Sequence, residues 1–265
     1  MSDLASPELP AALRERTLAR FEDHRRAWQA NPALRACYGH WYGELRKALP
    51  PHALGPWIEI GSGPGFAREF IPELELTDVV QAPWHARRMS AESLALEDDS
   101  VGALLLFDVL HHVAAPATFF AEATRVLRPG GRILLCEPYI SPLSRWVYRR
   151  FHPEPVDMSV DPLVAAAQDA EEAKDPFDSN QAIPTLIFCR DKGRIFESMF
   201  SQLSVVRVER MAGLAYPASG GFSHAPFLPA PLWRGLFALE NLMPEIAFRG
   251  FGFRMIAVIE RKPSP

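Results

Sequence analysis

The sequence has little cysteine and no long apolar run. The three cysteines, Cys37, Cys136 and Cys189, are far apart and form no CxxC pair, so they provide neither a disulfide framework nor a zinc-binding pattern. We therefore expect a reducing compartment and a cytoplasmic protein. The longest apolar run, Val101–Phe107, falls far short of the roughly 18 residues that a membrane-spanning helix needs.

The chain also lacks an excess of charge of either sign. Lys and Arg number 28 and Asp and Glu number 32, which gives a net charge of −4. This balance argues against a nucleic-acid partner. The first residues have neither the basic start nor the apolar segment of a signal peptide. We expect a small-molecule substrate and no integral membrane association, and the oligomeric state stays open.

Proline, by contrast, is abundant, with 25 among 265 residues, against the roughly 5% that is typical. Apolar residues make up 48% and charged residues 23%, which is the composition of a globular chain. The length suits one large domain with elaborations. We expect an N-terminal helical extension over 1–50, a core over 51–140, and cap insertions with the last strands of the same sheet over 141–265.

Strand and helix patterns alternate after the first fifty residues, which predicts a parallel sheet covered on both faces. Asn31-Pro32 is a typical cap before an amphipathic helix. Only 11 residues separate Asp78 from Ser90, which is too few for a normal helix and strand, so this edge of the sheet should be reduced. The expected strands are 57–60, 74–80, 101–107, 133–136, 203–208 and 254–260, and the expected helices include those starting at 116, 139, 164 and 183.

A glycine turn follows the first expected strand, with Gly61, Gly63 and Gly65 in a GxGxG pattern. Such a turn lets backbone approach a nucleotide, and the helix that it opens offers free N–H groups. A dinucleotide fingerprint would need glycine where the chain has Phe66, and no GxxxxGK[ST] loop is present. Asp78 ends the second strand, where a carboxylate suits two ribose hydroxyls. The pattern predicts an adenosyl ligand with free ribose hydroxyls.

Five segments occur together, in order: 59–65, Asp78, 90–94, 108–113 and 125–131. With them the chain resembles the class I S-adenosylmethionine-dependent methyltransferases, in the type 11 subgroup that includes quinone-biosynthesis enzymes. The resemblance covers about a third of the chain. It implies an α/β Rossmann-like methyltransferase fold, with a mostly parallel seven-stranded sheet, helices on both faces, N-terminal helices and a helical or loop cap. It also implies S-adenosyl-L-methionine as the cofactor.

The same resemblance implies which residues hold the cofactor. Glu59 faces the methionine ammonium and Asp78 the ribose hydroxyls, although Glu59 could also cap its strand and Asp78 could be a surface turn residue. The family usually has Asp where this chain has Ser90, so Glu92 or backbone would bind the adenine amino group. The expected cofactor contacts are Glu59, Gly61, Ser62, Gly63, Gly65, Asp78, Ala91, Glu92, Phe107 and Asp108.

Most candidate catalytic residues follow the expected strands 101–107 and 133–136, and ligands of open α/β sheets bind beyond such strand ends. His152 is a candidate general base because imidazole titrates near working pH. The alternative to a catalytic role is, for each candidate, a structural role in packing. Adjacent histidines diverge on one segment and no third ligand stands nearby in sequence, so no metal site is expected. The candidates are His111, His112, Glu137, Tyr139 and His152.

Methyl transfer from a sulfonium requires alignment and exclusion of water more than a catalytic triad. The aromatic and proline-rich second half is typical of an enclosing apolar cap, which predicts O- or C-methylation of a small, apolar or aromatic molecule. The segment 213–233 is either a lid or a packed loop. The alternatives are a non-catalytic S-adenosylmethionine-binding or scaffolding protein, a nicotinamide oxidoreductase, which Phe66 disfavours, and a nucleic-acid methyltransferase.

Overall fold

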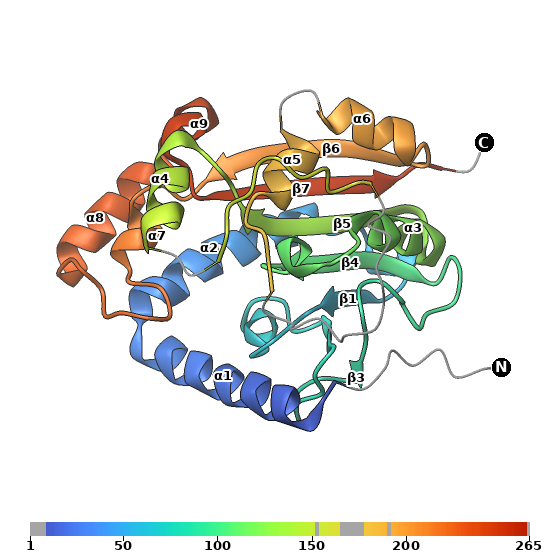
Figure 1. Ribbon diagram of the computed structural model, residues 1–265, viewed down its shortest axis with the longest axis horizontal. Helices are drawn as coiled ribbons and strands as arrows, with labels where there is room; N and C mark the ends of the chain where they lie inside the picture. Colours follow the sequence, from blue (N-terminus) through green and yellow to red (C-terminus); the bar gives the residue numbers. More distant parts are fainter. Residues whose placement is uncertain (1–8, 152–153, 165–177, 190–191, 264–265) are drawn as a thin grey trace.

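Two helices begin the described chain, and a covered sheet follows them (Figure 1). The computed structural model describes residues 9–151, 154–164, 178–189 and 192–263. The helices are α1 (Ala11–Ala30) and α2 (Pro32–Ala48). The side chain of Asn31 accepts a hydrogen bond of 3.0 Å from the N–H of Leu34, and Pro32 takes the first helical position. The predicted cap between the helices is confirmed.

Seven strands form one sheet in the order β3-β2-β1-β4-β5-β7-β6. The strands from β3 to β5 are parallel, whereas β7 is antiparallel to both of its neighbours. The predicted fold class, α/β with a mostly parallel sheet, is confirmed. The bounds are β1 (Trp57–Ile60), β2 (Glu75–Asp78), β3 (Arg87–Arg88), β4 (Val101–Phe107), β5 (Leu127–Pro138), β6 (Leu203–Met211) and β7 (Arg254–Arg261).

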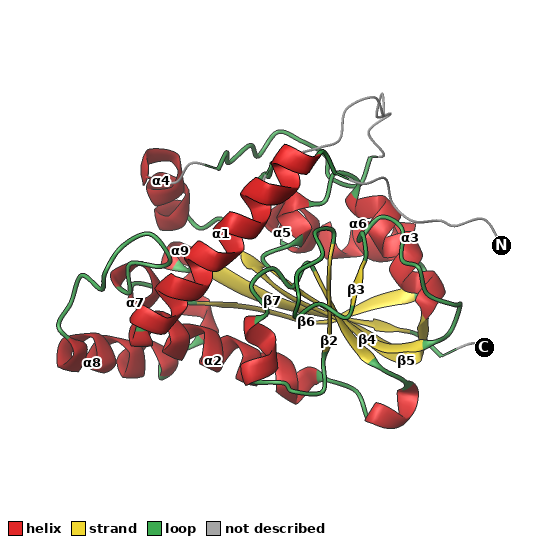
Figure 2. Cartoon of the chain, turned by 90° about the horizontal axis from the view of Figure 1, so that it is seen from below, coloured by secondary structure: helices red, strands yellow, loops and turns green. Residues whose placement is uncertain are grey.

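Both faces of the sheet are covered, so every residue of β4 is buried, as its continuous apolar sequence predicts. One face packs against α2 through the cluster that holds Trp41, Leu105 and Phe107. The other face packs against three helices that carry Phe119, Phe188 and Phe196. Figure 2 shows these helices across the sheet from α2. These helices are α3 (Pro116–Val126), α5 (Ile183–Phe188) and α6 (Lys192–Met199).

The β2–β3 edge is reduced, as predicted. Strand β3 has 2 residues, and no helix lies between it and β2 in the fully described segment 79–86. The helix expected after the neighbouring glycine turn is a single 3-10 turn, η2 (Phe66–Glu69). Pro72 restricts the residue before it and has no N–H to donate, and β2 begins soon afterwards.

The later helices gather at the end of the sheet toward which β1 points (Figure 1). They are α4 (Pro142–Phe151), α7 (Ala215–Ala218), α8 (Ala230–Asn241) and α9 (Phe248–Phe251), with the 3-10 turn η4 (Glu245–Ala247) directly before α9. Two further 3-10 turns are η1 (His52–Leu54) and η3 (Leu110–His112). The alanine-rich helix expected near 164–174 lies almost wholly outside the described residues. Within the described part of the chain, no helix combines the length and hydropathy needed to cross a bilayer.

Candidate functional site

The glycine turn after β1 requires glycine on two grounds. Gly61, Gly63 and Gly65 have φ values of 66°, 47° and 80°, a region that other residues enter at a cost. A Cβ on Gly61 would lie 2.6 Å from a methyl carbon of Val109, and one on Gly65 would lie 2.7 Å from Cδ1 of Trp84. The spacing seen in the sequence therefore reflects both backbone conformation and close approach.

Asp78 ends β2 and holds this turn in place. Its Oδ2 accepts a hydrogen bond of 2.8 Å from Gly63 N–H, and its Oδ1 accepts one of 2.9 Å from Val80 N–H. Burial raises the pKa of this carboxyl, and the backbone N–H groups oppose that shift. Each carboxylate oxygen can accept a further hydrogen bond, so Asp78 can hold the turn and a ligand hydroxyl together.

Glu59 lies beneath the turn with an unsatisfied oxygen. The side chain is buried, and Tyr42 on α2 donates a hydrogen bond of 3.1 Å to Oε1. Its Oε2 has no hydrogen-bond partner among the described residues. Burial raises the pKa of Glu59 to about 8. A buried carboxylate oxygen without a partner is costly, and a cationic ligand group would satisfy it.

The turn lies under α1 and the β2–β3 connection. Phe21 of α1 is the side chain nearest to a Cβ built on Gly63. Gly63 C=O accepts a hydrogen bond of 2.7 Å from Trp84 Nε1 and lies 2.8 Å from His85 Nε2. Arg25 on α1 also donates to Pro64 C=O. Phe21, Trp84 and His85 could not be predicted as neighbours of the turn, because no local sequence pattern links them to it.

Two of the expected cofactor contacts already have partners in the protein. The Ser62 hydroxyl donates to Glu59 C=O and accepts from Thr77 N–H, so it ties β1 to β2. Glu92 Oε1 accepts a hydrogen bond of 2.7 Å from Ala115 N–H. Ala91 beside it is buried. Ala91 and Glu92 are the residues expected beside the adenine, and the Glu92 carboxylate is engaged with the backbone just before α3.

An ion pair closes the end of β4. Asp108, with a φ of 57°, binds Arg254 at the start of β7 through both carboxylate oxygens. The guanidinium lies 4.9 Å from the ring centroid of Trp41, 5.5 Å from that of Phe107 and 5.0 Å from that of Tyr216, all within cation–π range. Sequence analysis places Phe107 and Asp108 correctly at the strand end but misses Arg254, which looks there like a strand residue.

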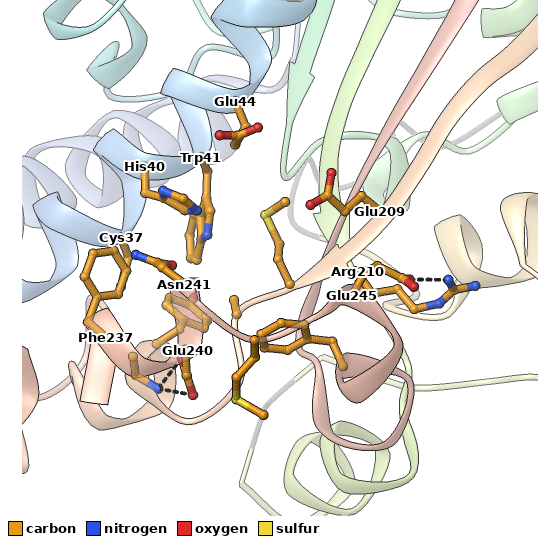
Figure 3. Close-up of a pocket in the computed structure, with 16 residues that line it drawn as sticks. Cys37, His40, Trp41, Glu44, Glu209, Arg210, Phe237, Glu240, Asn241 and Glu245 are labelled. Carbon is orange, nitrogen blue, oxygen red and sulfur yellow. Dashed lines mark hydrogen bonds and ion pairs between the residues drawn. The ribbon is translucent and has the colours of Figure 1, made fainter. Parts of the chain in front are cut away.

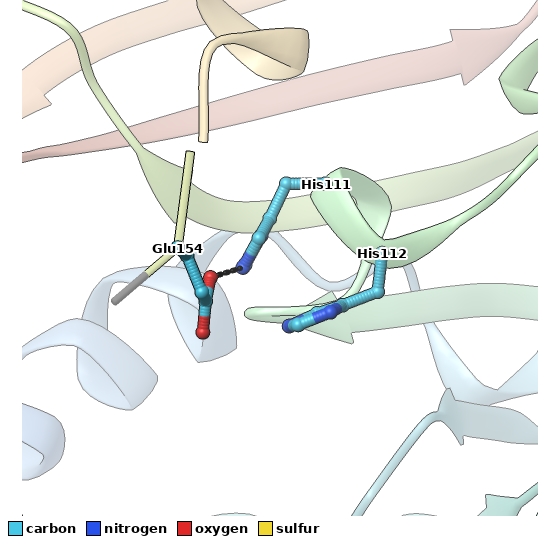
Figure 4. Close-up of side chains that lie close together, drawn as sticks. All are labelled: His111, His112 and Glu154. Carbon is cyan, nitrogen blue, oxygen red and sulfur yellow. Dashed lines mark ion pairs between the residues drawn. The ribbon is translucent and has the colours of Figure 1, made fainter. Parts of the chain in front are cut away.

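A second polar cluster joins the ends of β4 and β5 (Figure 4). Glu137 is fully buried, and one of its oxygens accepts from Val109 and Leu110 N–H while the other lies 2.6 Å from His111 Nδ1. His111 Nε2 lies 3.6 Å from Glu154. Burial alone lowers the pKa of His111, but the two carboxylates outweigh it and raise it to about 9.

The remaining candidates are dispersed. His112 packs beside His111, with ring centroids 4.2 Å apart, so the two histidines do not diverge as their adjacency suggests. Tyr139 donates to Arg249 C=O at 3.4 Å, and its ring lies 5.3 Å from the Arg210 guanidinium, which draws it away from the histidines. His152 lies outside the described residues.

A cavity of about 170 Å³ opens on the α2 side of the sheet (Figure 3). Trp41 lines it and also packs against Arg254, the partner of Asp108. Ala215 and Tyr216 line it too, which gives two residues of the 213–233 segment a place in its wall. The same segment is tied to the N-terminal helices by Asn31, whose amide donates to Ser219 C=O at 2.8 Å.

Residues 58–135 match the family described as "Methyltransferase domain". The matched range runs from β1 into β5 and contains the glycine turn, Asp78 and the His111–His112 pair. The match confirms the resemblance found in the sequence, and it supports an enzyme that uses S-adenosyl-L-methionine.

A curated relative is the "Uncharacterized 37.1 kDa protein in transposon TN4556" of Streptomyces fradiae, 54% identical over 46 residues, which are 17% of this chain and 13% of that protein. The match thus spans a small part of that relative. Similar solved structures include the YcgJ protein of Bacillus subtilis, with 17% identity, 85% of this chain and 99% of that chain covered, and a TM-score of 0.44.

Geranyl diphosphate C-methyltransferase of Streptomyces coelicolor A3(2), solved with Mg²⁺, geranyl diphosphate and S-adenosyl-L-homocysteine, is 15% identical. The alignment covers 84% of this chain and 78% of that chain, with a TM-score of 0.43. Phosphoethanolamine N-methyltransferase 2 of Haemonchus contortus, solved with S-adenosyl-L-methionine, is 13% identical. The alignment covers 85% of this chain and 53% of that chain, with a TM-score of 0.44. Likenesses at this level do not specify a substrate.

Proposed function

We propose, for a chain whose residues 58–135 belong to the methyltransferase-domain family, that it transfers a methyl group to oxygen or carbon of a small, apolar or aromatic molecule. The observation that carries the proposal is the glycine turn joined to Asp78 beside the unsatisfied Glu59 oxygen. S-adenosylmethionine supplies an electrophilic methyl group on a sulfonium. These residues would hold it at the carboxyl ends of β1 and β2.

The residues around the turn fit an adenosyl cofactor by their chemistry. The Glu59 carboxylate suits the methionine ammonium, and a bound cation would favour its ionised form. The Asp78 carboxylate suits the ribose hydroxyls and disfavours a phosphate in their place. Trp84 and Phe21 cover the turn, so they would exclude water from the ligand once it is bound.

The acceptor is proposed to bind among the aromatic side chains beyond the end of β4. The buried rings of Tyr38, whose centroid lies 4.8 Å from that of Phe107, and of Trp41 would form part of its lining. Tyr216 extends it from the cap. Such a lining favours a flat or apolar acceptor over a highly charged one.

Calorimetric titration with S-adenosylhomocysteine tests the cofactor site. Asp78→Asn keeps the size of the side chain but removes the charge, so we expect the dissociation constant to rise at least about tenfold, the effect of losing one charge-assisted hydrogen bond. Asp98→Asn is the matched control, because Asp98 is exposed and pairs with Arg125 at the surface. Equal affinity in the wild type and Asp78→Asn would contradict this placement.

Turnover with phenols, quinones and polyketide acids tests the acceptor class, with release of S-adenosylhomocysteine as the readout. Binding of the cofactor without turnover on any of these acceptors would instead favour the non-catalytic alternative. NAD is titrated in parallel, and binding of NAD alone would mean that the glycine turn serves an oxidoreductase.

A further inference from the structure

The cluster at the ends of β4 and β5 has the composition of a metal centre. His111, His112 and Glu154 offer ligand atoms that all lie within 4.8 Å of one another. Figure 4 shows both imidazoles and the carboxylate on the same side of η3. From this geometry we infer a zinc-type divalent cation site formed by His111, His112 and Glu154, in place of the expectation of no metal drawn from the sequence.

The spacing of the best-fixed pair suits a shared ion. Ligand atoms about 2.1 Å from a tetrahedral zinc ion lie roughly 3.4 Å from one another. His111 Nε2 and Glu154 Oε2 are 3.6 Å apart, which is longer than a charged hydrogen bond. Small movements of these side chains would bring both atoms to coordination distance. Imidazole nitrogen and carboxylate oxygen are a donor set that zinc accepts.

The hydrogen bonds around the proposed ligands are of the kind that orients metal-bound side chains. Metal-bound histidines usually donate the second ring N–H to a carboxylate, and His111 Nδ1 lies 2.6 Å from Glu137. Glu137 is itself fixed by Val109 and Leu110 N–H. The Glu154 carboxylate is positioned by hydrogen bonds that Ser179 and Gln181 donate to its Oε2, the oxygen that faces His111, so a bound ion would replace at least one of these bonds at that atom.

The charges around His111 also favour a bound cation. Glu137 and Glu154 flank His111 from both sides, and the carboxylate of Asp108 lies within 4.8 Å of the His111 and Glu137 ligand atoms. The Asp108 charge is matched by Arg254. Two carboxylates beside one imidazole form a setting that a positive charge stabilises, and a dication supplies that charge in place of the His111 Nε2 proton. Glu137 is then a positioning residue that orients His111.

Three protein ligands leave coordination positions open, which is the pattern of catalytic rather than structural zinc. An ionisable oxygen of the acceptor molecule fits such a position. This part of the inference rests on the proposed methyl transfer, whereas the metal site itself does not.

Metal content is the direct test, made on the full untagged chain. The protein is equilibrated with Zn²⁺, dialysed against metal-free buffer and analysed by mass spectrometry for metal. We expect about one zinc per chain and, after exchange into Co²⁺, visible absorption bands of a tetrahedral ion. Zinc no higher than the buffer background, or cobalt without these bands, would overturn the inference.

Matched variants locate the site. Glu154→Gln and His112→Gln should each weaken zinc binding at least tenfold, while Glu97→Gln and His224→Gln, both exposed, should bind as the wild type does. Glu137→Gln should weaken it by roughly 10- to 100-fold. Zinc binding that neither Glu154→Gln nor His112→Gln alters would overturn the assignment of ligands.

Titration with S-adenosylhomocysteine on zinc-loaded and zinc-free protein keeps the two proposals apart. A chain that binds zinc but no adenosyl ligand refutes the proposed function alone. A chain that binds the adenosyl ligand but no zinc refutes only the metal site. Thermal unfolding of each variant without metal separates loss of a ligand from loss of the fold.

Discussion

At the scale of single residues, the site contains a buried carboxyl that the fold holds protonated. Burial raises the pKa of Glu59 to about 8, while the same group in the unfolded chain titrates near its ordinary value of about 4.3. Between these values the folded protein keeps a proton that the unfolded chain has released. Raising the pH through this window therefore favours unfolding, by up to about 1.4 kcal/mol per pH unit.

We predict that Glu59→Gln removes this dependence. Urea unfolding of wild type and Glu59→Gln at pH 6, 7 and 8 should show the wild type losing stability relative to the variant as the pH rises. Above pH 8 the unfolding free energies of the two proteins should change with pH in parallel, because Glu59 is then deprotonated in both the folded and the unfolded state. Parallel curves across the whole range would mean that Glu59 is already ionised in the folded protein.

The residues that could be predicted carry a local signal. Gly61, Gly63 and Asp78 stand at fixed places after two strands, and the structure joins Gly63 to Asp78 by a hydrogen bond. Tyr42 and Glu154 carry no such signal, because each reaches its site from a distant part of the chain. No periodicity or motif specifies that kind of contact, so side chains facing a site from another element stay hidden in a single sequence.

At the scale of elements, α1 acts as a cover on the glycine turn. Phe21 is buried against Val80 and Ala82, and Trp28 stacks on Phe66 with ring centroids 4.1 Å apart. The helix was expected from its apolar positions, but its place over the turn was not. Its packing partners are spread over the segments 61–66 and 79–85, so their common surface exists only in the folded sheet.

We predict that Phe21→Ala loosens this cover. Removing a buried phenyl ring costs about 3 kcal/mol of folding free energy, and the amides of Gly63 and Gly65 should exchange hydrogen faster. Hydrogen-exchange mass spectrometry of peptides that span 61–66 measures the effect. Gln29→Ala, an exposed change on the same helix, should leave that exchange unaltered. Unchanged exchange in Phe21→Ala would show that the turn is protected without α1.

The strands and the long helices were predictable because their patterns extend over many residues, as in β4 and α2. A short helical segment after Gly65 was predictable too, but its 3-10 form was not, because four residues are too few to show a period. Within 213–233, α7 has 4 residues, which is too short for periodicity to show. There the contacts with α2, rather than local propensity, decide the conformation.

At the scale of the whole molecule, the Asp108–Arg254 pair joins the middle of the chain to its last described strand. Breaking a buried ion pair leaves one charge without a partner, which costs about 3 kcal/mol. We predict that Arg254→Met lowers the free energy of unfolding by this order. The double variant Asp108→Asn/Arg254→Met should be less destabilised than the sum of the two single variants, as urea denaturation measures. Strictly additive losses would contradict the coupling.

The strand order also bears on how the chain is made. Strand β7 lies between β5 and β6, yet it is the last of the three in sequence. During synthesis, β5 therefore emerges with one edge unpaired, and it stays so until residues 254–261 have followed. An apolar strand edge left open in this way can pair with other chains. The nascent protein is thus most vulnerable to aggregation while the cap is being synthesised, and a chaperone that shields β5 would act in that interval.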